Sequence, residues 1–381
     1  MRGAFGSLCA ASLLAICIAC APATPPVVVH DAAMAPQRLS EWGVVFADGD
    51  YLRINDGVTP YDLNTPLFSD YAQKLRTVWL PPGTQAEYRD QGPFEFPVGT
   101  IISKTFHYRY ESSDKNAGAS IVLVVGDGEV MLDERDRLAL DEYHLVETRL
   151  LVRYAEGWKA FPYIWNAAQT DATLEVAGDI RPYRYVRDGG VASEFNYVVP
   201  DANQCSGCHA VDHSSKAIEP IGPRAWQLDR DYRYQGIVRK QLTHWLDTGI
   251  IDRVPAKLPR GANWLHPGGA SLEDRTKAYL DVNCAHCHNA VGAADTSGLD
   301  LDLGNPVGRS YGICKPPVAV GRGSGDRPFD IYPGRPDESI LLYRMQHSDP
   351  AIAMPELGRS LVHDEGVHTV REWIASLDGD C

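Results

Sequence analysis

The chain has 381 residues, of which 44% are hydrophobic and 23% are charged. This composition suits two or three globular domains, and it excludes a disordered chain, a coiled coil, a collagen-like fibre and a protein with many membrane spans. With 36 Lys and Arg against 50 Asp and Glu, the formal net charge is −14, which disfavours duplex nucleic acid and acidic substrates as partners.

Residues 1–19 are predicted to be a signal peptide. One basic residue, Arg2, precedes an apolar run that is shorter than the roughly 18 to 20 residues needed to cross a bilayer. The run ends in Cys17-Ile18-Ala19-Cys20, which resembles a bacterial lipobox with Cys20 as the lipidated residue. The resemblance implies a lipoprotein on the periplasmic face of the outer membrane; the alternative is ordinary cleavage further on, into the periplasm. Residues 20–38 are expected to be a tether, and the rest of the chain to lie in an oxidising compartment.

Residues 39–200 are expected to form a β-rich domain. Segments 96–110, 119–125 and 144–166 are rich in β-branched and aromatic residues, and turn-forming residues such as Gly126-Asp127-Gly128 interrupt the region. Short strands joined by such turns predict a β-sandwich or a small barrel. An alternative is a binding module for a polysaccharide or a partner protein with exposed aromatic residues, although buried packing is the default for such residues.

Two segments carry the pattern C-x-x-C-H, which is the attachment pattern of c-type haem. In this spacing two thiols add to the vinyl groups of one porphyrin, and the following His binds the iron. The sequence therefore predicts two covalent c-type haems. The first is held by Cys205 and Cys208 with His209 as proximal ligand, and the second by Cys284 and Cys287 with His288. The alternatives are structural zinc and a redox dithiol; His286, in the variable slot of the second motif, is expected at the surface.

Residues 268–381 are expected to be a helical haem module. Ser271 begins a predicted helix that leads to the second motif, a second helix spans residues 340–347, and residues 367–377 have the apolar spacing of a terminal helix. Met354-Pro355 lies between the last two. This order resembles a class I cytochrome c domain, which implies Met354 as the sixth ligand of the second haem and a raised reduction potential. The alternatives are that Met354 only packs in the core, or that Met345 is the ligand.

Two further cysteines, Cys314 and Cys381, belong to the same module. In an oxidising compartment they are predicted to form a disulfide that contributes on the order of 4 kcal/mol by restricting the unfolded chain. The alternative is two free thiols.

Residues 201–267 are expected to hold the first haem, and their pattern departs from class I cytochromes. Extended chain precedes the motif, and no Met occurs between His209 and His288. The local candidates for the sixth ligand are His213, His244 and His266. Residues 99–106 are similar to a segment of the cytochrome P460 family, which implies that haem 1 packs on the β region with His107, His144 or no residue as sixth ligand. Otherwise Lys104 and His107 lie on a solvated face.

Over its full length the chain resembles a family of exported bacterial diheme c-type cytochromes. The residues that carry this resemblance are Pro66 to Asp70, Glu147 to Leu151, Cys205 to His209, Ile221 to Pro223, Val282 to His288, Pro333 to Arg344 and Met354-Pro355. The expected fold is multidomain, with an all-β N-terminal region followed by mainly α cytochrome c modules. The resemblance implies one-electron transfer between redox partners, and the acidic chain suggests partners that are basic at the docking surface. The alternative is a diheme peroxidase-like oxidoreductase with an open first haem.

Overall fold

The structure is a computed structural model that describes residues 24–110, 120–122, 132–186, 193–210, 212–258 and 261–381. The predicted signal peptide and Cys20 lie outside these ranges. Among the described residues, no helix combines the length and the apolar character that crossing a membrane requires.

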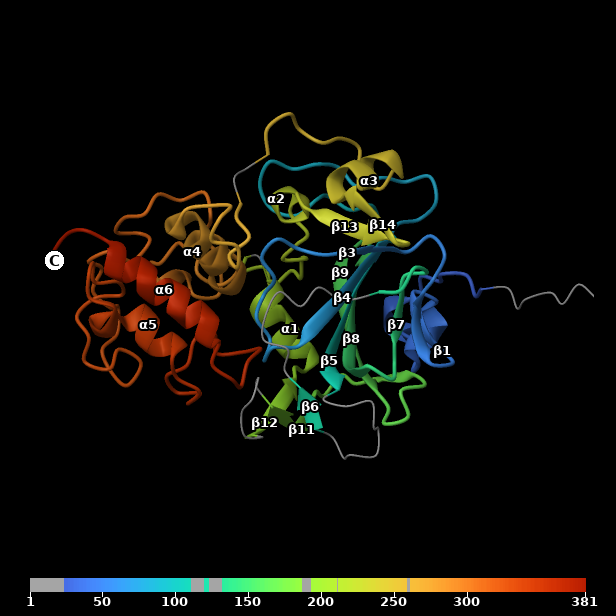
Figure 1. The fold of residues 1–381 in the computed structure, drawn as a ribbon, viewed down its shortest axis with the longest axis horizontal. Coiled ribbons are helices and arrows are strands. Elements are labelled where there is room, and N and C mark those ends of the chain that lie inside the picture. Colours follow the sequence, from blue (N-terminus) through green and yellow to red (C-terminus); the bar gives the residue numbers. More distant parts are fainter. Residues whose placement is uncertain (1–23, 111–119, 123–131, 187–192, 211, 259–260) are drawn as a thin grey trace, which may run out of the picture.

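A nine-stranded sheet dominates the described chain (Figure 1). β5 is its centre: it pairs antiparallel with β4 and β8, and its C-terminal end pairs with β6. From β6 the sheet continues through β11, in parallel register, to β12; from β8 it continues to β9 and β10. The strands are β3 (Thr59–Tyr61), β4 (Gln73–Trp79), β5 (Ile101–Tyr110), β6 (Ser120–Val122), β8 (Tyr143–Tyr154), β9 (Gly157–Trp165), β10 (Ala172–Leu174), β11 (Asp179–Val186) and β12 (Ser193–Val199).

Both faces of the central strands are largely buried, although the strands carry polar and charged residues such as Lys74, His107 and Glu147. One face, with Ile101 and Leu150, packs on a small sheet of β1 (Val45–Asp48), β2 (Tyr51–Ile54) and β7 (Arg137–Ala139). The other face carries Ile102, Lys104 and Phe106 and turns toward the remainder of the chain.

Residues 24–38 lie against the β-rich domain, which differs from the free tether expected for this segment. The backbone N–H of Val28 donates to the carbonyl of Trp42 at 3.0 Å, and the hydroxyl of Tyr154 donates to the carbonyl of His30 at 2.8 Å. Two short 3₁₀ helices, η1 (Ala32–Met34) and η2 (Leu39–Trp42), follow the same surface.

The expectation of mainly α modules after the β-rich region is wrong. The protein is β-rich, with about 20% of its residues in helices. Residues 201–267 include a hairpin, and residues 298–335 are turns and loops rich in Gly and Pro, which do not extend a helix. The elements are α1 (Ala202–His209), α2 (Ala225–Leu228), β13 (Asp231–Tyr234), β14 (Ile237–Lys240), α3 (Gln241–Asp247), α4 (Leu272–Leu280), the π-helical η3 (Asp281–Ala285), η4 (Asp295–Ser297), η5 (Pro336–Glu338), α5 (Ile340–Met345) and α6 (Asp364–Ser376).

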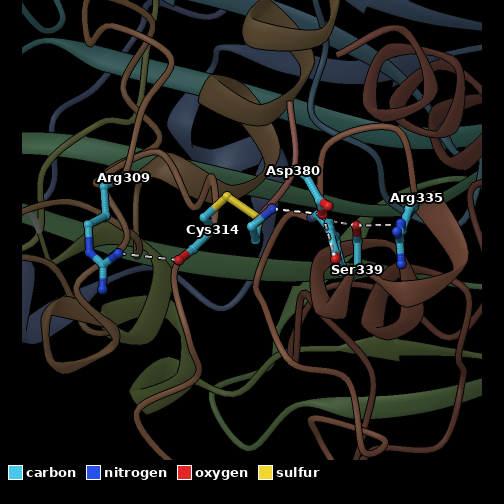
Figure 2. Close-up of a disulfide and its surroundings, with 7 residues drawn as sticks. Arg309, Cys314, Arg335, Ser339 and Asp380 are labelled. Atoms are coloured by element: carbon cyan, nitrogen blue, oxygen red, sulfur yellow. Dashed lines mark hydrogen bonds between the residues drawn. A yellow bond between two sulfur atoms is a disulfide. The ribbon is translucent and has the colours of Figure 1, made fainter. Parts of the chain in front are cut away.

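A disulfide between Cys314 and Cys381 ties the C-terminus to this loop region (Figure 2). Their Cα atoms are 5.4 Å apart, and the bond closes a segment with a sequence separation of 67. The Asp380 carboxylate accepts from the Cys381 backbone N–H and from the Tyr332 hydroxyl, which fixes the last residues against the chain before α5.

Candidate functional site

One cavity is lined by residues of both C-x-x-C-H motifs. Its empty space is about 1460 Å³, the open mouth included. Cys205, Cys208 and His209 reach it from α1, which the Asp201 side chain caps by accepting from two backbone N–H groups. Cys284 and His286 reach it from η3 and the residue after it. In Figure 1, α1 lies between the main sheet and the part of the chain that contains α4, α5 and α6.

The two motif segments also touch each other directly. The Cys287 thiol donates to the carbonyl of Gly207 at 3.5 Å, and the His213 backbone N–H donates to the carbonyl of Val291 at 2.9 Å. A Cβ at Gly207 would lie 3.3 Å from a methyl group of Leu357, so Gly permits the close packing of α1 on the neighbouring loop.

Each motif histidine is held through Nδ1. His209 Nδ1 lies 2.7 Å from the carbonyl of Glu219, which can only accept. His288 Nδ1 lies 3.0 Å from the Ser297 Oγ, whose own hydrogen goes to the carbonyl of Ala294. Both rings therefore carry the proton on Nδ1 and present a lone pair on Nε2, which is the arrangement that metal-ligating histidines use. Burial lowers the pKa of His209 to about 3 and that of His288 to about 4, so both rings are neutral near pH 7.

The four motif cysteines are free thiols. Burial raises the pKa of all four, to about 12 for Cys284 and Cys287. Each motif therefore offers two neutral thiols and one neutral imidazole, which are the groups that covalent haem attachment requires. In the described part of the chain, no three His, Cys, Asp or Glu side chains gather closely enough to hold a bare metal ion.

Two thioethers reach the same cavity, those of Met345 and Met354. The Met354 loop is fixed by Arg359, which donates to the carbonyls of Met354 at 2.8 Å and His347 at 2.9 Å. The Asp70 carboxylate accepts from two backbone N–H groups just after Arg359, both at 2.7 Å. The segment before β4 therefore positions the loop that carries Met354.

The sheet forms a cationic wall of the cavity. Arg76, Lys104 and Arg149 are neighbours across β4, β5 and β8, an arrangement that is unfavourable unless the charges are compensated. Arg149 pairs with the buried Glu147 at 2.5 and 2.8 Å, and Arg76 pairs with an aspartate of the β3–β4 connection. Burial lowers the pKa of Lys104 to about 7. Lys104 and Arg149 line the cavity, so the prediction of a solvated face for Lys104 is wrong.

The histidines considered for the first haem lie elsewhere. His244 stacks on Tyr234, His213 is exposed, and His107 is fully buried in the sheet beside Tyr143. His144 lies between the hydroxyls of two tyrosines, and His266 is in a loop. None of the five lines the cavity described here.

Two other histidines do line the cavity. His286 was expected at the surface but is half-buried and faces the cavity. His363 stacks on Phe68 at 4.1 Å between ring centroids, and its Nδ1 bonds the Tyr279 hydroxyl at 2.9 Å. The sequence carries no spacing signal for either residue, because both positions depend on tertiary packing.

The segments that carry the family resemblance converge on this cavity. All of them except Pro333 to Arg344 contribute lining residues: Leu67, Phe68 and Ser69; Arg149, Leu150 and Leu151; Cys205, Cys208 and His209; Ile221 and Gly222; Cys284 and His286; Met354 and Pro355. Segments that are far apart in the sequence thus meet at one place.

Comparisons with known protein families, with curated proteins and with solved structures find no match for this chain.

Proposed function

We propose that this chain is a diheme c-type cytochrome that transfers single electrons in the bacterial envelope. Cys205 and Cys208 would hold the first haem with His209 on its iron, and Cys284 and Cys287 would hold the second with His288. When bound, each haem supplies a one-electron ferric/ferrous couple. A signal peptide and a lipid on Cys20 would place the protein at the periplasmic face of the outer membrane.

The observation that carries this proposal is a cavity lined by thiols of both motifs, with the histidine of each motif held in the same way. His209 lines this cavity, whereas Cys287 and His288 do not. Each histidine follows a pair of free thiols, has Nδ1 held by an acceptor and leaves Nε2 for a metal. Met354 is the proposed sixth ligand of the second haem, because its loop brings a thioether into the cavity that Cys284 also lines. Arg149 is already paired with Glu147, so Lys104 is the cation of the sheet wall that would interact with the carboxylate groups of a haem.

The two motif segments are in direct contact, which favours electron transfer from one haem to the other. The redox partners would be proteins with a basic docking surface, since the chain has a net charge of −14. The alternative function, a diheme peroxidase-like oxidoreductase, requires an open first haem.

The proposal is tested by counting covalent haems in the chain produced in a host that matures c-type haem. We expect two haems per chain in the denatured protein, and one after either the double change Cys205→Ser/Cys208→Ser or the double change Cys284→Ser/Cys287→Ser. The matched control, Cys314→Ser/Cys381→Ser, should keep two. Absence of covalent haem from the unaltered chain would contradict the proposal.

A further inference from the structure

His286 lies in the variable slot of the second motif, yet its side chain lines the same cavity as His209 of the first. Its Nδ1 atom is buried, and the backbone of Val282, four residues earlier, is the hydrogen-bonding group beside the ring. Lys104 lines this cavity as well, so the three side chains face the same space. His286 thus brings an imidazole of the second motif into the cavity that the first motif lines.

The position of His286 is fixed by contacts on both sides of it in the sequence. The next residue, Cys287, reaches the carbonyl of Gly207, two residues before His209. Val291 accepts from the backbone of His213, four residues after His209. The two motif segments are therefore joined at two points, and His286 is next to one of them.

The other side chains with a suitable nitrogen or sulfur have different surroundings. Met354, in the loop after α5, is assigned by the proposed function to the second haem, and Met345 is a buried residue of α5. The His363 ring is stacked on Phe68 and its Nδ1 bonds the Tyr279 hydroxyl. Lys104, on the sheet wall, is the direct rival.

We infer that His286 is the sixth ligand of the first haem. The inference rests on the proposed function, because it requires both haems. Neutral imidazole is the commonest nitrogen ligand for iron in proteins near pH 7. With His209 and His286 on its two faces the first haem would be closed to external ligands, as an electron carrier requires. His286 and His288 are two residues apart, so one short segment would join the two irons.

The test is carbon monoxide binding to the ferrous full-length chain that carries both haems. We expect no binding to the unaltered protein, binding to one of the two haems in His286→Ala, and binding to both in His286→Ala/Met354→Ala. The variant motif Cys-Ala-Ala-Cys-His keeps the attachment pattern, so the haem count should remain two. The matched control is His213→Ala, an exposed histidine of the same junction, which should bind none.

A second variant, His286→Met, keeps a ligand at this position and gives an independent readout. It should stay closed to carbon monoxide and raise the reduction potential of one haem, because a thioether favours ferrous iron. An unchanged potential would count against the inference.

Other outcomes would overturn the inference without touching the proposed function. Carbon monoxide binding to one haem of the unaltered protein, and to both haems in Met354→Ala, would mean that the first haem is open. Two closed haems in His286→Ala, with opening in Lys104→Ala instead, would assign the ligand to Lys104. Absence of covalent haem from the unaltered chain would contradict the proposed function itself.

Discussion

Two methionines reach the cavity, and substitution separates their roles. Met354→Ala should open one of the two haems to carbon monoxide and lower its reduction potential, because a thioether ligand is lost. Met345→Ala is the matched control. Met345 is only 6% exposed, so its loss should destabilise the fold by about 2 to 5 kcal/mol in urea unfolding while both haems stay closed. Opening in Met345→Ala but not in Met354→Ala would reverse the assignment.

Glu147 compensates a charge on the cavity wall. Its side chain is fully buried, binds Arg149 through both oxygens and accepts from the Tyr197 hydroxyl at 2.7 Å. Glu147→Gln keeps the shape but leaves the guanidinium unpaired, which should lower the free energy of unfolding by about 3 kcal/mol. The exposed Glu372, whose partner His368 is also exposed, is the control, and Glu372→Gln should change stability by less than about 0.5 kcal/mol. Equal effects in urea unfolding would contradict this role.

At the residue scale, the sequence predicts the groups whose function depends on local spacing. The motif cysteines and histidines follow from five-residue patterns, and the structure brings both patterns to one cavity. His286 could not be predicted, because its slot is variable and its surroundings come from α1, far away in the sequence. The prediction that Lys104 and His107 lie on a solvated face was wrong for a related reason. The alternation of residues along a strand identifies two faces, but it does not show that other parts of the chain pack on both.

At the scale of elements, α4 and α6 pack closely through a glycine. A Cβ at Gly366 would lie 2.3 Å from the hydroxyl of the buried Tyr279. Gly366→Ala should therefore push α6 from α4 and reduce stability by about 1 to 3 kcal/mol, although Ala favours helix formation. Glu372→Ala in the same helix is exposed and should not destabilise. Stabilisation of the protein by Gly366→Ala in thermal unfolding would contradict this packing.

The ends of helices were predictable where a side chain caps them, and other boundaries were not. α4 begins after the N-cap Ser271, whose hydroxyl accepts from the Asp274 backbone N–H, as expected. The segment before α3 forms the hairpin of β13 and β14, which no capping residue marks in the sequence. Gln235 and Gly236 both have positive φ, which is the backbone of a two-residue turn that joins twisted strands.

At the scale of the whole molecule, the cavity depends on long-range assembly. Pro66 to Asp70 contacts three separate parts of the chain. The Phe68 backbone N–H donates to the Asn283 side chain, the Phe68 ring stacks on His363, and Asp70 holds the chain after Met354. The sequence marks this segment as part of a family resemblance but does not show what it touches, since no local pattern encodes contacts across more than 200 residues.

Neutral histidines buried in the assembled fold predict sensitivity to acid. His107 is fully buried, neither ring nitrogen has a hydrogen-bond partner among the described residues, and the nearby charges are those of Lys74 and Arg76. Burial lowers its pKa to about 3. The unfolded chain binds a proton here below pH 6.5, whereas the folded chain does so only near pH 3, so stability falls as pH falls through that window.

His107→Phe should remove this part of the acid sensitivity. Between pH 6.5 and pH 5, the variant should lose about 2 kcal/mol less free energy of unfolding than the unaltered protein, whatever its stability at pH 7. The matched control is His368→Gln, a substitution at an exposed histidine. The measurement is urea unfolding at several pH values. The same dependence of unfolding free energy on pH in His107→Phe and in the unaltered protein would contradict this prediction. His107 would then take up its proton in the folded state, and the sheet would open around it before the chain unfolds.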